Sequence, residues 1–371
     1  MEPVRSRRHK QEFISLPFRL YKHDPCWVPP LISEMKERLD PKRHPFFTHG
    51  ESRFFLARRN GRVVGRVAAL IDRAHNAFHQ ERVVGFGFFD LEHDEEVAAA
   101  LLHEVAAWGL SQEMTILKGP FNYSTNEECG TLIEGFDSSP VIMMTYNPPW
   151  HVEVLASLGL EKSRDILAYY GDKTVPVDRL KRIMDRTIQR YSLSIRSLEM
   201  DRFDAELDLI RAIYNSAWEK NWGFVPMGDK EFRWQALKLK QIVEPKLVMI
   251  VEAAGDPAGF SLSLPDFNQV LKRLNGRLFP FGIIRYLRFR NKIDGIRVTA
   301  LGIRPEYRGI GAEGVLIYRT IVDALQLGFN WAELSWVLED NLPMRKIAEN
   351  LGARIYKRYR IWEAPLQRLT L

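Results

Sequence analysis

The sequence contains 371 residues, a length that suits two globular domains better than one. Hydrophobic residues make up 46% and charged residues 27% of the chain, which is ordinary for a globular protein and excludes a disordered composition. No apolar run reaches the roughly 18 to 20 residues of a membrane-spanning helix, so the integral membrane class is excluded. The net charge of +6 permits an anionic partner, such as coenzyme phosphates, a membrane surface or nucleic acid, without choosing one.

The sequence favours a cytoplasmic location. The N-terminal residues are basic but lack the apolar core of a signal peptide. Cys26 and Cys129 lie far apart and form no Cys-x-x-Cys pair, which is typical of reduced thiols. The sequence has no clustered acidic metal motif, so we expect no metal.

The first half of the chain is predicted to form one α/β unit. Residues 11–49 carry scattered aromatic residues and prolines and are predicted to be irregular, with one short helix at 31–39. Two apolar runs joined by Asn60-Gly61 predict a β-hairpin, because this dipeptide favours a two-residue turn. There follow a strand at 83–89, a helix at 95–110, a strand at 115–120, a short helix at 148–158 and a strand at 166–170.

The second half repeats this order of elements. A strand at 193–198 and a helix at 204–218 precede a hairpin made by 246–252 and 258–264. The remaining predicted elements are a strand at 295–303, a helix at 312–327, a strand at 331–338, a helix at 343–351 and a strand at 355–362. The shared order predicts a tandem duplication of one α/β unit, with domains at 1–175 and 176–371.

Residues 308–314 join the strand at 295–303 to the helix at 312–327 through two glycines, Gly309 and Gly311. The first amides of a helix lack intrahelical partners and carry partial positive charge, so this junction suits an anion. In the first half, the strand at 83–89 is instead followed by the acidic residues 90–96, which repel an anion. We therefore expect only the second half to bind an anionic carrier.

This junction resembles the pyrophosphate-binding loop of the GCN5-related N-acetyltransferase (GNAT) superfamily, Arg/Gln-x-x-Gly-x-Gly/Ala after a strand. Arg308 and Gly311 match the first two positions, whereas Glu313 stands where a small residue is usual. The order of elements is also the GNAT order. Runs such as Tyr146-Asn-Pro-Pro and Asn221-Trp-Gly-Phe extend the resemblance to a bacterial tandem-GNAT acyltransferase group that includes bacterial ceramide synthases.

The resemblance implies an α/β fold of tandem GNAT-like units, each a mixed central sheet flanked by helices, with a degenerate N-terminal unit. It implies an N-acyltransferase that takes an acyl group from acyl-CoA and passes it to a primary amine. Coenzyme A would lie where the strands at 295–303 and 331–338 splay apart. The residues implied for its binding are Leu301, Ile303, Arg308, Gly309, Ile310, Gly311, Ala312, Gly314 and Asn341.

The acid and base of such a reaction are less evident. Family members often protonate the leaving thiolate with a tyrosine in Asn-x-x-Ala-x-x-x-Tyr-x-x-x-Gly, but Ala348 occupies that position here. Side chains near the strand ends are the candidates for proton transfer: Tyr356, Tyr359, Glu339 and Asp266. The structural alternative is a packed strand tyrosine, a helix N-cap or a turn.

Two loops are candidates for the acceptor site. The long loop at 119–130 is rich in polar residues, and long loops of this composition in compact domains are usually functional. Its candidate residues are Asn122, Ser124, Asn126 and Glu127, and the alternative is a self-satisfied Ω-loop. Asn221 and Trp222, in an aromatic loop, are predicted to form an acceptor lid.

Residues 270–292 interrupt the second half with seven lysines and arginines, interleaved with apolar and aromatic residues and without an acidic one. This pattern predicts peripheral contact with an anionic membrane. A flank for coenzyme phosphates and a dimer interface are the alternatives, and no nucleic-acid partner is expected because no nucleic-acid module accompanies the segment.

The resemblance to bacterial ceramide synthases implies a long-chain acyl donor and a sphingoid base as the amine, and the membrane interpretation fits a lipid acceptor. A small-molecule N-acetyltransferase remains an alternative. So does a non-catalytic acyl-CoA-binding module, which Ala348 and Glu313 make plausible.

Overall fold

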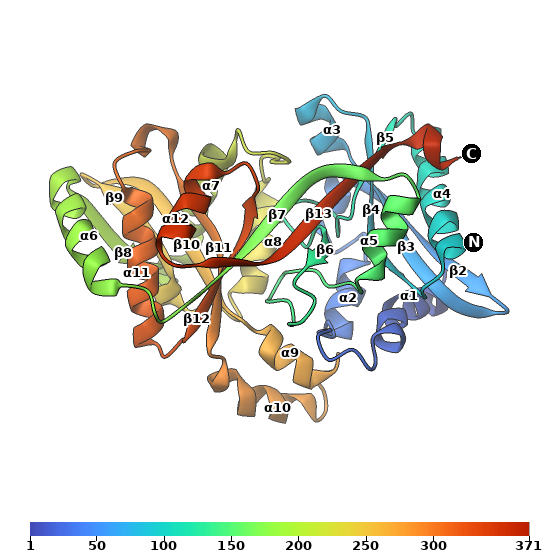
Figure 1. The fold of residues 1–371 in the computed structure, drawn as a ribbon, viewed down its shortest axis with the longest axis horizontal. Coiled ribbons are helices and arrows are strands. Elements are labelled where there is room, and N and C mark those ends of the chain that lie inside the picture. Colours follow the sequence, from blue (N-terminus) through green and yellow to red (C-terminus); the bar gives the residue numbers. More distant parts are fainter. Residues whose placement is uncertain (371) are drawn as a thin grey trace. The chain divides into compact units, whose positions relative to one another are not determined.

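The computed structural model describes residues 1–370, apart from the side chain of Arg179, and the chain forms two compact units (Figure 1). Unit 1 comprises Met1–Ile166, Asn268–Phe289 and the segment that begins at Lys357. Unit 2 comprises Leu167–Phe267 and Arg290–Tyr356. Strands β7 (Glu161–Asp172) and β13 (Arg354–Pro365) contribute residues to both units. The domain division at residue 175 stays a prediction.

Unit 1 is built on the strand order β1-β2-β3-β4-β5-β13, with β6 also paired to β13. The strands are β1 (Glu2–Pro3), β2 (Gly50–Arg59), β3 (Arg62–Asp72), β4 (Val83–Leu91), β5 (Ile116–Gly119) and β6 (Thr131–Glu134). The helices are α1 (Arg7–Leu20), α2 (Ile32–Arg38), α3 (Arg73–His79), α4 (Glu95–Ser111) and α5 (Trp150–Ser157). The predicted hairpin is confirmed, because Asn60 and Gly61 turn between β2 and β3 with φ of 51° and 78°.

Helix α1 corrects the prediction that residues 11–49 are irregular outside 31–39. Ser6 caps this helix by accepting a hydrogen bond from the amide of His9 at 3.1 Å. Phe13 and Ile14 are buried in the core under the β2–β3 hairpin. Pro17 lies inside the helix, and a proline at such a position hides a helix from pattern-based prediction.

Unit 2 is built on the strand order β7-β12-β11-β10-β9-β8. Its strands are β8 (Leu193–Ser197), β9 (Val248–Ala253), β10 (Asp256–Pro265), β11 (Gly295–Ile303) and β12 (Trp331–Leu338). Its helices are α6 (Val177–Tyr191), α7 (Phe203–Trp218), α8 (Asp229–Leu239), α11 (Ala312–Gln326) and α12 (Leu342–Asn350). Strands β11 and β12 are parallel, whereas β8, β9, β10 and β11 pair antiparallel in succession.

Helices cover both faces of the unit 2 sheet. Helices α6 and α11 pack against each other and against one face, where Val315 and Leu316 are buried with Ile303. Helix α7 packs on the other face, where Ile213 is buried with Phe260. Helix α6 was not predicted, although its apolar residues recur at helical spacing, from Val177 through Leu180, Met184 and Ile188 to Tyr191.

The same order of elements occurs in both units. The series β2–β3, β4, α4, β5, α5 and β7 matches β9–β10, β11, α11, β12, α12 and β13. In addition, α5 and α12 each end at a Leu-Gly pair whose glycine is left-handed, Gly159 with φ 79° and Gly352 with φ 82°. The predicted α/β duplication is therefore confirmed.

The basic segment at 270–292 lies between β10 and β11, where the structure has two short helices, α9 (Asn268–Leu274) and α10 (Gly282–Phe289). Both helices belong to unit 1. The side-chain amide of Asn268 donates to the carbonyl of Pro140 at 2.8 Å, and Lys272 Nζ donates to Ser139 Oγ at 2.8 Å. These contacts hold α9 and leave α10 more exposed.

Candidate functional site

The two parallel strands of unit 2 pair along only part of their length. Four residue pairs join them, from Gly295 with Trp331 to Val298 with Leu334. Beyond the last pair, β11 continues beside β10 to Ile303 and β12 continues to Leu338. The predicted separation of these strands is therefore present, and it begins at Val298 and Leu334.

A β-bulge lies at the same point. In the pairing of β10 with β11, Leu262 faces Ala300 and Ser263 faces Val298, so Thr299 is an extra residue. A bulge bends its strand and redirects the side chains that follow. Here the strand turns away from β12 at the residue where their pairing stops.

The loop that leads into α11 has the backbone of an anion site. Gly309 and Gly311 have φ of 81° and 82°, a left-handed conformation that favours glycine. Gly311 is the N-cap residue of α11, and glycine has no side chain that could accept a hydrogen bond from the first amides of the helix. The first intrahelical bond runs from the Val315 amide to the Gly311 carbonyl at 3.2 Å. The amides of Ala312 to Gly314 thus precede the helical bonding pattern, at the positive end of the helix dipole.

Arg308 and Glu313 set the charge of this loop. Arg308 donates to the carbonyl of Ala217 at 2.8 Å and to that of Ile303 at 3.4 Å, which ties the loop to the ends of α7 and β11. Glu313 is half-buried in the first turn of α11, and within residues 1–370 its Oε2 atom is buried without a hydrogen-bond partner. This carboxylate suits the helix dipole but repels a bound anion.

The equivalent helix start in unit 1 is already occupied by a carboxylate. The side chain of Asp94 caps α4 by accepting a hydrogen bond from the Val97 amide at 3.2 Å, and Glu95 and Glu96 follow. Asp90 is buried and bonded to the hydroxyl of Tyr21 at 2.7 Å. The start of α4 is thus negative and capped, which is unsuitable for a second anion.

Four side chains form a buried polar network where the unit 2 strands separate. Arg297 Nε donates to Ser335 Oγ at 2.9 Å, and Ser335 in turn bonds the carboxylate of Glu333. The hydroxyl of Tyr356, on β13, donates to the other oxygen of that carboxylate. Arg297, Glu333 and Ser335 are all buried. A carboxylate that shares hydrogen bonds with two hydroxyl groups is suited to accept or pass on a proton.

The network lies next to the point where β11 and β12 separate, and we call the space between the separated strands the opening. Arg297 and Glu333 are paired across β11 and β12, one position before Val298 and Leu334. Because side chains alternate along a strand, the network lies on one face of the sheet and Val298 and Leu334 lie on the other. The opening is thus polar on one face and apolar on the other.

The four predicted proton-transfer residues lie in different places. Tyr356 belongs to the network, whereas Tyr359 is buried in unit 1, where it pairs with Leu132 of β6. Glu339 follows β12, and its carbonyl accepts a bond from Arg345 at 2.7 Å. Asp266 is buried after β10, and its amide donates to the Gly295 carbonyl at 2.9 Å.

Prediction from sequence missed Arg297, Glu333 and Ser335. The available signal was the alternation of polar with apolar residues in strands that are otherwise core, Arg297 between Ile296 and Val298 and Glu333 between Ala332 and Leu334. That alternation places polar groups on one buried face.

Asn341, implied as a coenzyme ligand, caps α12, because its side chain accepts a bond from the Met344 amide at 3.3 Å. Ala348 is buried in one cluster with Tyr169 of β7. Burial raises the pKa of Tyr169, whose hydroxyl is bonded to Arg345 and Glu349. The tyrosine that packs beside Ala348 therefore comes from β7 and not from α12 itself.

The structure places the polar acceptor candidates of the first half in one loop of unit 1, where their groups bond to one another and to buried neighbours. Asn122 donates to Glu128 at 2.9 Å, Glu127 pairs with buried Arg38 at 3.0 Å, and Ser124 accepts from the Asn126 amide at 3.2 Å. The assignment of these residues to an acceptor site stays a prediction.

Asn221 and Trp222 lie in unit 2, in the loop between α7 and α8. The Asn221 amide donates to the Trp218 carbonyl at 2.8 Å. The indole of Trp218 covers β11 so closely that a Cβ at Gly302 would lie 2.1 Å from its ring. This loop therefore follows directly on a helix end that contacts the unpaired half of β11.

Among the residues that the structure describes, no group of three or more histidine, cysteine, aspartate or glutamate side chains is arranged to hold a metal ion. Over the same residues, no helix has the length and apolar character needed to cross a bilayer.

Comparison with known proteins identifies relatives of this chain. No protein-family model matches the sequence. The chain is 37% identical to protein YghO of Escherichia coli strain K12 over 361 residues, which covers 95% of this chain and 91% of that protein. It is 36% identical to a bacterial ceramide synthase of Caulobacter vibrioides over 375 residues, which covers 98% and 97%.

A solved tandem GNAT protein from the clavulanic acid biosynthesis pathway shares the fold, with a TM-score of 0.58 at 12% identity over 98% of this chain and 97% of that one. Two proteins that are more than one-third identical over nearly their whole lengths belong to the same family, and both sequence relatives meet this condition. The chain therefore belongs to the tandem-GNAT acyltransferase group that contains bacterial ceramide synthase, and it is an N-acyltransferase.

Proposed function

We propose that this protein transfers a long-chain acyl group from acyl-CoA to the primary amine of a sphingoid base. One observation carries the proposal: the opening between β11 and β12 has an uncapped helix start near one end and a buried carboxylate network at its base. The 36% identical relative named bacterial ceramide synthase supports a sphingoid base as the acceptor.

The donor would be held by main-chain groups more than by side chains. The pyrophosphate of coenzyme A would accept hydrogen bonds from the amides that follow Gly311, with Arg308 adding positive charge. Its pantetheine arm would lie along Leu301 and Ile303, where β11 has left β12. The arm would thus extend from the start of α11 toward Val298.

The chemistry needs three proton transfers. The acceptor's ammonium group must lose one proton before its nitrogen attacks the thioester carbon. As the C–S bond breaks, the nitrogen loses a second proton to become an amide, and the leaving sulfur gains one to become the thiol of coenzyme A. We assign Glu333 as the base and Tyr356 as the acid, because they share a hydrogen bond at the base of the opening. Glu339 and Asp266 stay candidates for binding the ammonium group.

A basic apolar surface on unit 1 fits an enzyme that takes a lipid acceptor. It consists of the turn before α10 and the outer side of α10, where Phe279 is 72% exposed, Phe281 74%, Ile284 64% and Leu287 53%. Arg277, Arg285 and Arg288 are exposed beside them, and residues 267–293 contain no acidic residue. Large exposed apolar side chains among cations are typical of a helix that lies in an anionic membrane interface.

The decisive test is an assay of purified protein with palmitoyl-CoA and sphinganine or its 3-keto form, followed by mass spectrometry. The proposal predicts the N-acyl product. Turnover with acetyl-CoA and none with long chains would select a small-molecule N-acetyltransferase instead. Thermal stabilisation by coenzyme A, without transfer to a broad panel of amines, would select a non-catalytic module.

A further inference from the structure

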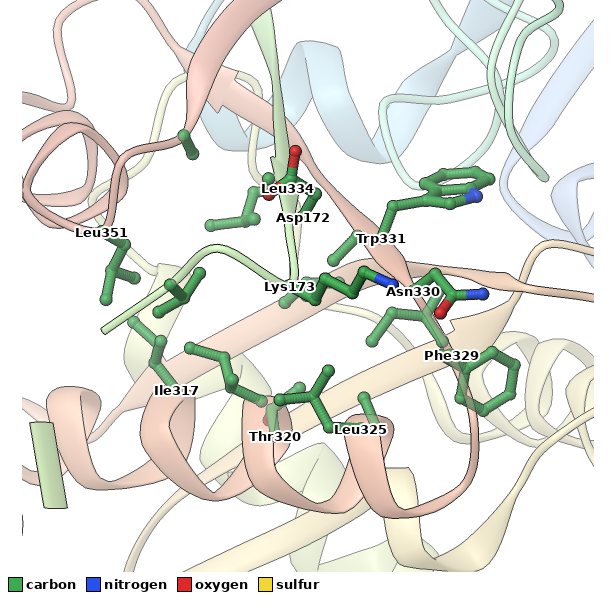
Figure 2. A pocket seen from close by; sticks show the side chains of 18 residues that line it. Asp172, Lys173, Ile317, Thr320, Leu325, Phe329, Asn330, Trp331, Leu334 and Leu351 are labelled. Atoms are coloured by element: carbon green, nitrogen blue, oxygen red, sulfur yellow. The ribbon is translucent and has the colours of Figure 1, made fainter. Parts of the chain in front are cut away.

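An apolar cavity of about 80 Å³ lies in unit 2 beside the paired halves of β11 and β12 (Figure 2). Figure 2 shows Ile317, Thr320 and Leu325 extending from α11 toward it, with Leu334 and Leu351 on its other sides. The cavity opens toward solvent at Lys173 and Leu325, which are both exposed.

The walls of the cavity suit a hydrocarbon. Ile296 and Val298 of β11 line it together with Ala332 and Leu334 of β12. The hydroxyl of Thr320, the polar group on its helical wall, already shares a hydrogen bond with Ser261 Oγ at 3.2 Å. A polar ligand would therefore lose its hydration here with little compensation.

The position of the cavity relates it to the proposed donor path. Val298 and Leu334 are the last paired residues before the strands separate, and both line the cavity. A pantetheine arm that runs from Gly311 along Ile303 and Leu301 would place its thioester near this point. A chain that continued in the same direction would enter the cavity.

We propose that this cavity holds a stretch of hydrocarbon chain from one of the two substrates. The inference rests on the proposed function, and its geometry favours the tail of the acyl donor. The volume is about half that of a cavity known to hold benzene, which corresponds to roughly three carbon atoms. The chain therefore enters through its carbons nearest the thioester, and its remainder extends toward the mouth at Leu325.

Substitutions that narrow the cavity test the inference through the binding of coenzyme A and acyl-CoA, without turnover. Gly171 lines the cavity, its φ is not left-handed, and a Cβ there would meet Ala353 at the ordinary distance of 3.6 Å. Gly171→Leu should therefore fill space at little cost in folding, and Gly171→Ala gives a graded change. Ile321→Phe narrows the cavity from α11, and Gly228→Leu is the matched control, because Gly228 has open space and lies outside the cavity.

Isothermal titration with coenzyme A and with octanoyl-CoA reports the contribution of the tail. Each buried methylene tightens binding by about fourfold, so three give roughly 60-fold. For the unmodified protein and for Gly228→Leu, we expect the Kd of octanoyl-CoA to be at least about 10-fold lower than the Kd of coenzyme A. Gly171→Leu and Ile321→Phe should remove most of that difference while binding coenzyme A as before.

A second arm compares the KM of sphinganine with that of a short amine in the same variants. If only the preference for the long acceptor is lost, the cavity holds the acceptor's tail. If the dependence on tail length survives both fillings for donor and acceptor, the inference is overturned. Tail-dependent binding without any product would contradict the proposed function and leave this inference in place.

Discussion

Arg297 of β11 and Glu333 of β12 face each other across two parallel strands, one residue pair before those strands separate. Both side chains are buried, and Ser335 and Tyr356 connect to them through hydrogen bonds. Burial of this network at the start of an opening is costly unless its groups are paired. This makes the network the strongest candidate for the proton transfers of an acyl transfer.

Tyr356→Phe tests the assignment with little disturbance, because it keeps both buried charges. We expect kcat to fall about 10- to 100-fold while the Kd of coenzyme A is unchanged, since the hydroxyl acts on the leaving group. Glu333→Gln should lower kcat by about 100-fold or more, but it also leaves Arg297 uncompensated. Steady-state kinetics and thermal unfolding separate the two effects.

Tyr191→Phe is the matched control, since Tyr191 is the last residue of α6 and takes no part in the network. A Tyr356→Phe variant whose kcat stayed within about threefold of the unmodified enzyme would remove Tyr356 as the acid.

Glu313→Gln should increase affinity for coenzyme A. Its carboxylate lies in the first turn of α11, where it repels the pyrophosphate that we place there. We expect the Kd to fall roughly three- to tenfold at low ionic strength and less at high salt, because salt weakens the repulsion between the half-buried carboxylate and the pyrophosphate. Unchanged affinity at both ionic strengths would show that the pyrophosphate lies elsewhere.

Phe279→Ser combined with Phe281→Ser should reduce binding to vesicles of phosphatidylcholine with phosphatidylglycerol. Each ring inserted into the interface contributes about 2 kcal/mol, so the loss should exceed tenfold in a sedimentation assay. Phe78→Ser is the control, because Phe78 is also an exposed phenylalanine of unit 1 but lies outside the basic apolar surface. Equal losses for the two changes, or binding that ignores the anionic lipid, would refute the membrane contact.

His151 should make unit 1 sensitive to acid. Burial lowers the pKa of His151 to about 4, against an ordinary value of about 6.5 in the unfolded chain. The unfolded state therefore takes up a proton first, and stability is lost as the pH falls from about 6.5 to about 4, by up to about 3 kcal/mol. Urea unfolding at pH 7.5 and 4.5 should show a smaller loss for His151→Phe. Parallel losses would contradict this role.

The fold could be predicted from sequence wherever local pattern and burial agree. The bounds of β11 and β12 follow from their apolar runs, and the hairpin follows from Asn60-Gly61. Helix α1 could not be recognised, because Pro17 contradicts helix propensity and only tertiary packing of Phe13 and Ile14 reveals the buried face.

The candidate site was predictable only in part. The glycine loop before α11 has a local signature, and both glycines adopt the conformation that this signature requires. The network could not be derived, because it depends on which strands are neighbours and in what register. Arg297 and Glu333 are far apart in sequence and meet through the pairing of β11 with β12, and Tyr356 joins them from β13 through its hydrogen bond to Glu333.

The central claim is that coenzyme A binds at the start of α11 and not at the start of α4. Isothermal titration of the full chain with coenzyme A tests it through both stoichiometry and affinity. We predict one site per chain, weakened at least about 10-fold by Arg308→Glu and unchanged by the same charge reversal at the exposed Arg202. Two sites per chain, or an affinity that Arg308→Glu leaves unaltered, would contradict the account.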